Sequence, residues 1–247
     1  MVVATAHGAH LRSRTRDEPS ARRPGRRRHA RPEWPCSRET SLNATLPEPP
    51  LREAKATLRA RMRALRKARG PGERAAAGRA AAQLLAELLP TLPSGPVAIF
   101  HALPDEIDTI PAIAAIAASG RSVVLPRQAG RARPLDFHAF RPGDPLMPGP
   151  FGVLEPIAAA PRLEPAVLIV PLLAFDRRGG RLGYGAGFYD RTIASLRERG
   201  GAPPAIGFAF AFQEVDEVPL APTDARLDAI VTEREVIRLA DPSGAGR

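Results

Sequence analysis

The sequence predicts an α/β fold, a three-layer sandwich in which helices cover a mostly parallel sheet. Short apolar runs rich in branched residues, typical of strands covered on both faces, alternate with longer helical segments. The longest apolar runs, such as residues 166–174, are too short to span a membrane and suit buried strands. One domain is expected over residues 51–240, and a chain of this length can bury a substantial core.

The first expected helix begins at Leu51 and is amphipathic, because its apolar and basic positions occupy different faces. The segment 70–72, Gly-Pro-Gly, ends it. An alanine- and leucine-rich stretch predicts a second helix over residues 73–89, closed by Pro90. In the first helix the apolar positions are Leu51, Ala54, Leu58, Met62 and Leu65, and the basic ones are Lys55, Arg59, Arg63 and Arg66.

The rest of the domain is expected to supply the sheet and two more helices. Pro111 suits the first turn of a helix over residues 111–118, and a glycine pair closes a helix over residues 188–199. Residues 135–140 alternate less cleanly than the other strands and predict a strand nearer the sheet edge. The remaining strand segments are residues 97–100, 122–125, 166–170, 205–210 and 228–239.

Basic residues are concentrated at the N-terminus. The formal net charge is +10, and ten arginines against five acids place half of this excess in the first 50 residues. Residues 1–50 lack hydrophobic periodicity and are expected to be a disordered basic tail, and residues 241–247 a flexible end. An arginine-rich tail also fits a nucleic-acid-binding protein, which is the main competing class.

Cysteine usage and hydropathy indicate a cytoplasmic protein with no membrane partner. Cys36 is the only cysteine, so no disulfide can form within the chain, and a thiol nucleophile is not expected in the tail. No apolar segment follows the arginines as a secretory signal requires. No His/Cys spacing indicates zinc, and His101 and His138 are expected to be structural.

A glycine cluster marks the expected functional loop. Five glycines fall within residues 179–187, between a buried strand and a helix. Glycine lets main-chain N–H groups approach a ligand and a helix N-terminus attracts anions, so the loop can hold a phosphate, with Arg181 adding a charge. A tight structural turn explains the same cluster. The order of the glycines is neither that of a Walker loop nor that of a dinucleotide fingerprint.

Three charged residues have both a structural and a functional interpretation. Asp190, just inside the following helix, can stabilise the helix dipole or bind Mg²⁺ on a nucleotide. Lys55 and Arg59 stand four residues apart on one helix face. They can form a solvated cationic surface or reach the phosphates of ATP.

Two segments around the loop carry a resemblance to a known family. Residues 170–176 read Val-Pro-Leu-Leu-Ala-Phe-Asp, and residues 181–191 read Arg-Leu-Gly-Tyr-Gly-Ala-Gly-Phe-Tyr-Asp-Arg. This order resembles the signature of the 5-formyltetrahydrofolate cyclo-ligases, or methenyltetrahydrofolate synthetases. The resemblance covers roughly residues 51–235 and departs in detail at Leu172, Ala186 and Phe188 without removing a charge. Further segments fall in family order at residues 55–59, 106–109, 125–127, 151–156 and 224–233.

The resemblance implies the fold of sugar-phosphate isomerases and CoA-transferases, with ATP and Mg²⁺ as cofactors. A relative of those enzymes, which would not require ATP, is a third alternative. The resemblance assigns catalysis to Lys55, Arg181 and Tyr184, and the metal to Asp190 and Asp224, where a Thr/Asp turn is the alternative for Asp224. It implies nucleotide binding by Lys55, Arg59, Arg181, Gly183, Tyr184, Gly185, Ala186, Gly187, Phe188, Tyr189 and Asp190.

Three residues are expected to bind the folate, which can be polyglutamylated. By resemblance Glu106 contacts its pterin or formyl end, where a helix cap is the alternative. Tyr184 is expected to be a wall for the pteridine ring. Arg127 can hold a phosphate or the glutamate tail, or be a surface charge. Gln213 is a weaker site candidate, and a monomer is expected.

The reaction that the resemblance implies cyclises 5-formyltetrahydrofolate to 5,10-methenyltetrahydrofolate, with hydrolysis of ATP to ADP and phosphate. A formamide carbon is a poor electrophile and its oxygen is a poor leaving group. Phosphorylation of that oxygen removes both obstacles. The protein then aligns ATP and folate and neutralises charge, which fits a sequence with arginines near glycines and no nucleophile motif.

Overall fold

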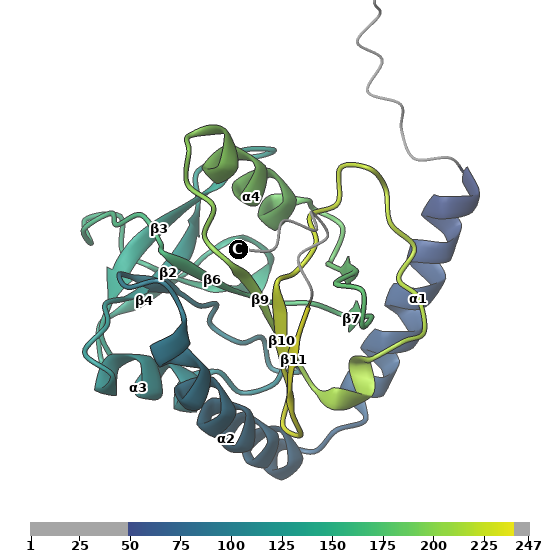
Figure 1. Cartoon of the computed structure of the whole chain (residues 1–247), viewed down its shortest axis with the longest axis horizontal. Coiled ribbons are helices and arrows are strands. Elements are labelled where there is room, and N and C mark those ends of the chain that lie inside the picture. The colour runs from purple at the N-terminus through teal and green to yellow at the C-terminus, as the bar shows by residue number, and fades with distance from the viewer. Residues whose placement is uncertain (1–48, 240–247) are drawn as a thin grey trace, which may run out of the picture. The chain divides into compact units, whose positions relative to one another are not determined.

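The computed structural model describes residues 49–239, which belong to the second of two units that meet at residues 44 and 45. The predictions for the basic tail before residue 49, including Cys36, and for residues 241–247 lie outside the described residues. At the centre is a seven-stranded sheet with the order β11-β10-β9-β6-β1-β2-β3 (Figure 1). Its five inner strands are parallel, and the two edge strands, β3 and β11, pair antiparallel. The predicted mostly parallel sheet is therefore confirmed.

The elements follow the predicted order with small shifts at their ends. The helices are α1 (Pro49–Lys67), α2 (Pro71–Leu88), α3 (Ile110–Ala118) and α4 (Phe188–Glu198). The sheet contains β1 (Val97–Ala98), β2 (Val123–Gln128), β3 (Leu135–Phe140), β6 (Val167–Val170), β9 (Ala205–Phe208), β10 (Ala229–Val231) and β11 (Val236–Arg238). Three short 3-10 turns are η1 (Leu89–Thr91), η2 (Pro150–Gly152) and η3 (Ala211–Gln213).

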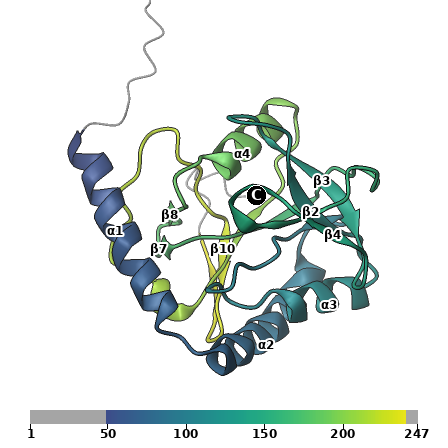
Figure 2. The ribbon, with the colours of Figure 1, turned by 180° about the vertical axis from the view of Figure 1, so that it is seen from behind.

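Two helices cover one face of the sheet and a third covers the other. Leu85 of α2 and Ile113 of α3 belong to one buried cluster, together with alternate residues of β1, β6 and β9. Ile193 and Leu196 of α4 belong to a second cluster with the intervening strand residues. Figures 1 and 2 show α2 and α3 on one side of the sheet and α4 on the opposite side. The described residues thus form the predicted three layers.

Helix α1 stands beside this sandwich and packs against a hairpin that the sequence did not predict. The hairpin consists of β7 (Ala174–Phe175) and β8 (Arg181–Leu182), and Met62 of α1 packs on it. The apolar and basic faces predicted for α1 do not correspond to a buried and an exposed face. Leu65 is 40% exposed, whereas Lys55 and Arg66 are buried. The two cations can be buried because partners on distant loops meet them, as described below.

Two further departures concern short antiparallel pairs. The predicted strand segment 228–239 is a hairpin of β10 and β11, because the hydroxyl of Thr232 accepts hydrogen bonds from the N–H groups of residues 234 and 235 and turns the chain. A second unpredicted hairpin, of β4 (Leu146–Pro148) and β5 (Leu154–Pro156), lies outside the main sheet. Within residues 49–239, no helix combines the length and apolar character needed to cross a membrane.

Candidate active site

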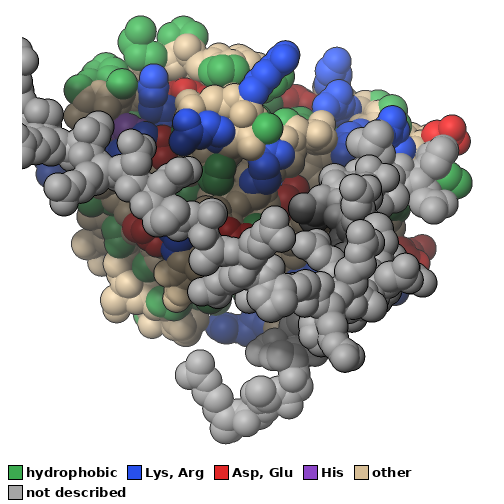
Figure 3. Space-filling model, turned by 90° about the horizontal axis from the view of Figure 1, so that it is seen from above, with side chains coloured by type: hydrophobic (Ala, Val, Ile, Leu, Met, Phe, Trp, Pro, Cys, Tyr) green, Lys and Arg blue, Asp and Glu red, His purple; other side chains and the backbone are tan. Residues whose placement is uncertain are grey.

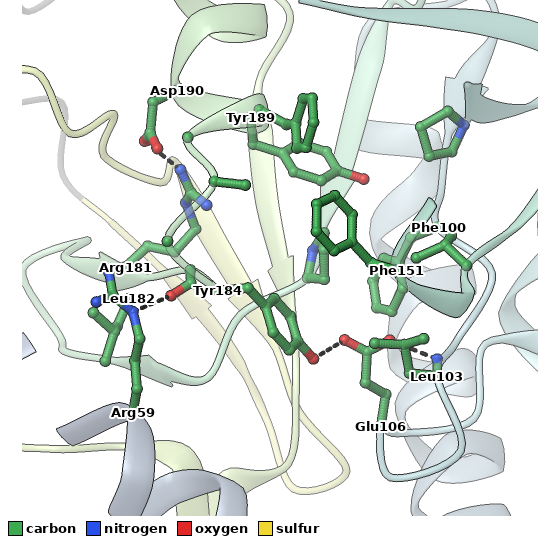
Figure 4. Close-up of a pocket in the computed structure, with 18 of the residues that line it drawn as sticks. Arg59, Phe100, Leu103, Glu106, Phe151, Arg181, Leu182, Tyr184, Tyr189 and Asp190 are labelled. Carbon is green, nitrogen blue, oxygen red and sulfur yellow. Dashed lines mark hydrogen bonds and ion pairs between the residues drawn. The ribbon is translucent and has the colours of Figure 1, made fainter. Parts of the chain in front are cut away.

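A cavity of about 830 Å³ lies where α1, the loop after β1 and the glycine loop between β8 and α4 meet (Figure 4). Its size suits a small-molecule ligand. The structure brings nearly all predicted site residues to this cavity, although they come from four separate parts of the chain. Those in its wall are Lys55, Arg59, Glu106, Arg181, Gly183, Tyr184, Gly185, Ala186, Gly187, Phe188, Tyr189, Asp190 and Asp224.

The glycine loop has a backbone that favours glycine at two positions. Gly185 has φ +105°, and Gly187, the N-cap residue of α4, has φ +67°. Residues other than glycine rarely adopt such φ angles. Arg59 supports the loop from α1, since its Nε donates a hydrogen bond to the carbonyl of Gly183 at 3.0 Å. Burial, followed by the like charge of Arg63, lowers the pKa of Arg59, so an anion nearby would be stabilising.

Two ion pairs join the predicted cations to the predicted metal ligands. Arg181 lies 2.6 Å from Asp190 Oδ1, which also accepts the N–H of Ala225 at 3.1 Å. Lys55 Nζ pairs with Asp224 Oδ2. Because Ala225 directly follows Asp224 in the chain, the two carboxylates belong to one corner of the cavity. Arg181 is buried, and its Nε has no partner among the described residues.

The donor set at this corner fits a metal ion that a nucleotide also holds. Among residues 49–239, no three His, Cys, Asp or Glu side chains form a group that could enclose a metal ion. Asp190 and Asp224, however, each use only one carboxylate oxygen in hydrogen bonds between described residues. Magnesium on nucleotides takes one or two carboxylates and completes its shell with phosphate oxygens and water. Two carboxylates that each have one oxygen outside the hydrogen bonds between described residues therefore suit Mg²⁺ bound to a nucleotide.

Tyr184 and Glu106 face each other at the other end of the cavity (Figure 4). The Tyr184 hydroxyl donates to Glu106 Oε1, and the N–H of Leu103 donates to Oε2 at 2.7 Å. Burial raises the pKa of Glu106, although Arg66 and the Tyr184 hydrogen bond oppose the rise. Burial, together with the charge of Glu106, also raises the pKa of Tyr184. Glu106 precedes α3 by four residues and caps no helix, so the helix-cap alternative is wrong.

Aromatic rings flank this end of the cavity. Phe151, in η2, has φ +59° and is 76% exposed, an unusual combination for a large apolar residue. Its ring centroid lies 6.5 Å from that of Phe188 in an edge-to-face arrangement. Figure 4 shows Phe151, Tyr184 and Tyr189 on the side of Glu106, with the basic residues on the opposite side. The cavity thus has one charged end and one aromatic end.

Three other predicted residues make contacts outside the cavity wall. Arg127 donates to the carbonyl of Pro156 at 2.8 Å and does not line the cavity. Gln213 donates to two main-chain carbonyls and accepts the N–H of Phe210, so its amide is fully occupied as a structural tie. His138 is buried with Nδ1 2.8 Å from the carbonyl of Ala160, in agreement with a structural role.

The sequence reasoning missed Arg66, Asp105 and Phe151, which also line the cavity. A signal for Arg66 was present. It lies seven residues after Arg59 and eleven after Lys55, so all three share one face of α1. Asp105 and Phe151 sit in loops without periodicity, and no comparable signal marked them.

Charge on the surface is mixed in sign. On the face seen in Figure 3, Lys and Arg side chains recur with Asp and Glu side chains among them. Several arginines are paired with acids, as Arg177 is with Glu214 and Glu235. Pairing of this kind leaves less free positive charge for phosphates than an unpaired basic stripe, which a nucleic-acid-binding surface requires.

Known proteins that are similar to this chain agree with the family that the sequence signature indicates. The sequence profile of the 5-formyltetrahydrofolate cyclo-ligase family matches residues 51–233. The 5-formyltetrahydrofolate cyclo-ligase of Escherichia coli strain K12 is 33% identical over 185 residues, which are 71% of this chain and 98% of that protein. The NMR structure of Aquifex aeolicus 5,10-methenyltetrahydrofolate synthetase superposes with a TM-score of 0.61 at 28% identity and covers 78% of this chain and 96% of that one. A Mycoplasma pneumoniae 5,10-methenyltetrahydrofolate synthetase, 22% identical with a TM-score of 0.58, covers 73% of this chain and 99% of its own and shares the fold.

Proposed function

The chain belongs to the 5-formyltetrahydrofolate cyclo-ligase family, a family of ATP-using ligases, and from this membership we propose that it converts 5-formyltetrahydrofolate to 5,10-methenyltetrahydrofolate by phosphorylating the formyl oxygen. The observation that carries the proposal is the polarity of the cavity. Its charged end suits a nucleotide triphosphate, and its aromatic end suits a flat heterocycle. The two ligands would meet between these ends.

The charged end supplies what phosphoryl transfer needs. Arg181 is buried and its Nε has no partner within residues 49–239, and the glycine loop has a main chain that can approach phosphate oxygens closely. Lys55 and Arg59 reach the same cavity from α1. In phosphoryl transfer, positioning and neutralisation of charge account for most of the catalysis. We assign nucleotide binding to these residues and to the rest of the glycine loop.

Magnesium fits the corner formed by Asp190 and Asp224, as the donor set indicates. When bound there with the nucleotide, it supplies positive charge to the phosphoryl oxygens. The protein's own part is to hold one oxygen of each carboxylate through main-chain N–H groups, at 3.1 Å for Asp190 and 2.7 Å for Asp224. This leaves the other oxygen of each available to the ion.

The aromatic end supplies orientation. Glu106 accepts two hydrogen bonds and lines the cavity, so its remaining lone pairs can accept N–H groups of a pterin. Tyr184 and Phe151 offer ring faces or edges to the heterocycle. Held in this way, the formyl oxygen would face the terminal phosphoryl group, and the neighbouring folate nitrogen would close the ring as phosphate leaves. No protein nucleophile is required.

A spectrophotometric assay tests the proposal. Purified full-length protein is mixed with 5-formyltetrahydrofolate, and formation of methenyltetrahydrofolate is followed with ATP and Mg²⁺, with each omitted in turn, and with a non-hydrolysable ATP analogue. Product is expected only when both ATP and Mg²⁺ are present, with one ADP formed per product. Product without ATP, or no product under any condition, would refute the proposed reaction.

A further inference from the structure

Arg66 is the most deeply buried charged side chain in the described part of the chain. It is 1% exposed, although it belongs to a helix whose other arginines reach solvent or the cavity. Burying a guanidinium is costly unless its donors are paired. The groups that pair with Arg66 therefore indicate its role.

Every donor group of Arg66 faces a residue from the aromatic end of the cavity. Nε and one terminal nitrogen donate to Asp105 Oδ2, at 3.1 and 2.6 Å. The other terminal nitrogen donates to the Tyr184 hydroxyl and lies 3.7 Å from Glu106 Oε1. The guanidinium carbon also stands 5.3 Å from the centroid of the Tyr184 ring, a cation–π distance. Arg66 thus joins the two residues proposed to receive the substrate.

The hydrogen bonds around Tyr184 suit a charged Glu106. A tyrosine hydroxyl has one proton, and here it accepts from Arg66 and donates to Glu106. Both oxygens of Glu106 accept a hydrogen bond, which is the pattern of an ionised carboxylate. A buried carboxylate keeps its charge only with a compensating cation nearby. The structure offers Arg66 for that purpose at 3.7 Å.

We propose that Arg66 is a positioning residue, which holds Tyr184 in place and keeps Glu106 ionised so that it can accept hydrogen bonds from the folate. This inference rests on the proposed function of the cavity. Each of the three guanidinium nitrogens of Arg66 already donates a hydrogen bond within the protein, and its side chain is only 1% exposed. It acts on the substrate through Tyr184 and Glu106.

Other charged or titratable groups lie near Glu106 or Tyr184, and a test must separate their effects from that of Arg66. Asp105 comes from its own loop, Tyr189 from α4, and Arg63 from α1, where it lies 5.7 Å from the Tyr184 ring. Asp105 opposes ionisation of Glu106, and burial opposes it more strongly. Arg66 is the cation within 4 Å of Glu106 among the described residues. Removal of the Arg66 guanidinium should therefore change the charge of Glu106.

The test compares Arg66→Met and Arg66→Lys with Arg61→Met, an exposed arginine on the same helix. For Arg66→Met, we expect KM for 5-formyltetrahydrofolate to rise by about ten- to a hundredfold, with KM for ATP within twofold of the control. The acid limb of kcat/KM should move up by about one pH unit. Arg66→Lys keeps the charge, so it should restore most of the pH profile while KM for folate stays raised.

A second measurement does not depend on turnover. In ligand-free protein carrying ¹³C-labelled glutamate, the carboxyl resonance of Glu106, assigned through Glu106→Gln, reports the midpoint of its titration. The midpoint should rise in Arg66→Met and stay near that of the wild type in Arg61→Met. This separates the present inference from the proposed reaction, because it can succeed or fail whether or not the wild type forms product.

Two outcomes would overturn the inference. One is an Arg66→Met protein that melts earlier but keeps the folate KM and the Glu106 titration of Arg61→Met, since Arg66 would then only support the fold. The other applies if Arg66→Met does not fold. In that case a folded Arg66→Lys with unchanged KM for folate shows that the geometry of the guanidinium is not needed to position the substrate.

Discussion

The two ends of the cavity both contain an arginine beside carboxylates, but they use these charges differently. At the charged end, Asp190 and Asp224 each leave one oxygen without a hydrogen bond between described residues, and Arg181 leaves Nε unpartnered. At the aromatic end, both oxygens of Glu106 accept hydrogen bonds and each guanidinium nitrogen of Arg66 donates one. At the charged end some oxygen and nitrogen atoms have no partner among the described residues, whereas at the aromatic end each oxygen of Glu106 and each guanidinium nitrogen of Arg66 already has one.

This difference indicates two modes of ligand binding. Groups with spare capacity can accept a phosphate or a cation while keeping their protein contacts. A network in which each charged atom already has a partner cannot exchange those partners without leaving a buried charge unpaired, so it holds a fixed geometry and offers a ligand the remaining lone pairs of Glu106. We therefore expect substitutions at the charged end to affect ATP and Mg²⁺ most, and substitutions at the aromatic end to affect the folate.

The largest effect is expected from Asp190→Asn, which should lower kcat by about 10²- to 10³-fold. The amide oxygen can still accept the N–H of Ala225, but the charge that would face Mg²⁺ is lost. Titration of turnover with Mg²⁺ should show a much weaker metal dependence. Near-normal kcat at ordinary Mg²⁺ concentrations would contradict the metal role.

Asp190→Ala is a less clean variant, even though it removes the same charge. Arg181 is buried and would lose its carboxylate partner, so the fold itself could be weakened. Thermal unfolding of both variants checks this point. We expect Asp190→Ala to unfold at a lower temperature than Asp190→Asn.

Lys55→Met sharpens the comparison between the two ends. The loss of one buried charged contact should raise KM for ATP by about ten- to a hundredfold. KM for folate should change by less than about threefold, because the ion pair of Lys55 is with Asp224 at the charged end. Steady-state kinetics with each substrate varied in turn measure both values. A dominant effect on the folate KM would break the division of the cavity.

Gly185→Ala tests the glycine loop without changing a charge. Gly185 has φ +105°, and an added Cβ would lie 3.4 Å from the guanidinium carbon of Arg59. Backbone strain of this kind costs roughly 1–3 kcal/mol, so KM for ATP should rise by about tenfold. Gly72→Ala is the matched control, because its added Cβ meets no atom within 4 Å. Equal ATP affinity in the two variants would argue that the loop does not contact the nucleotide.

The fold could be predicted wherever a local pattern was long enough to read. The strand at residues 166–170 and the helix from residue 188 were found within one residue at nearly every end, because continuous burial and a glycine stop are visible in the sequence. Strands of two residues, as in β7 and β8, carry no periodicity and were missed.

The site could be predicted as a set of residues but not as a set of contacts. The glycine cluster, Lys55 and Asp190 stood out through composition and the family signature. The burial of Arg66 did not, because its partners lie 39 and 118 residues away in the sequence. A cation on a helix is solvated by default, and only long-range packing makes it a buried one.

Tyr184→Phe gives the smallest effect that still separates the two ends. The ring stays, while the hydroxyl that donates to Glu106 and accepts from Arg66 is lost. That hydrogen bond favours the ionised form of Glu106, so its removal raises a pKa that burial has already raised. Glu106 is then protonated at a higher pH than in the wild type. The decline in kcat/KM for folate as pH falls should therefore begin at a higher pH. At a pH above this decline, the loss should be only about three- to tenfold, with KM for ATP unchanged. A pH profile parallel to that of the wild type would mean that the hydroxyl does not govern the charge of Glu106, and the network at the aromatic end would lose its central contact.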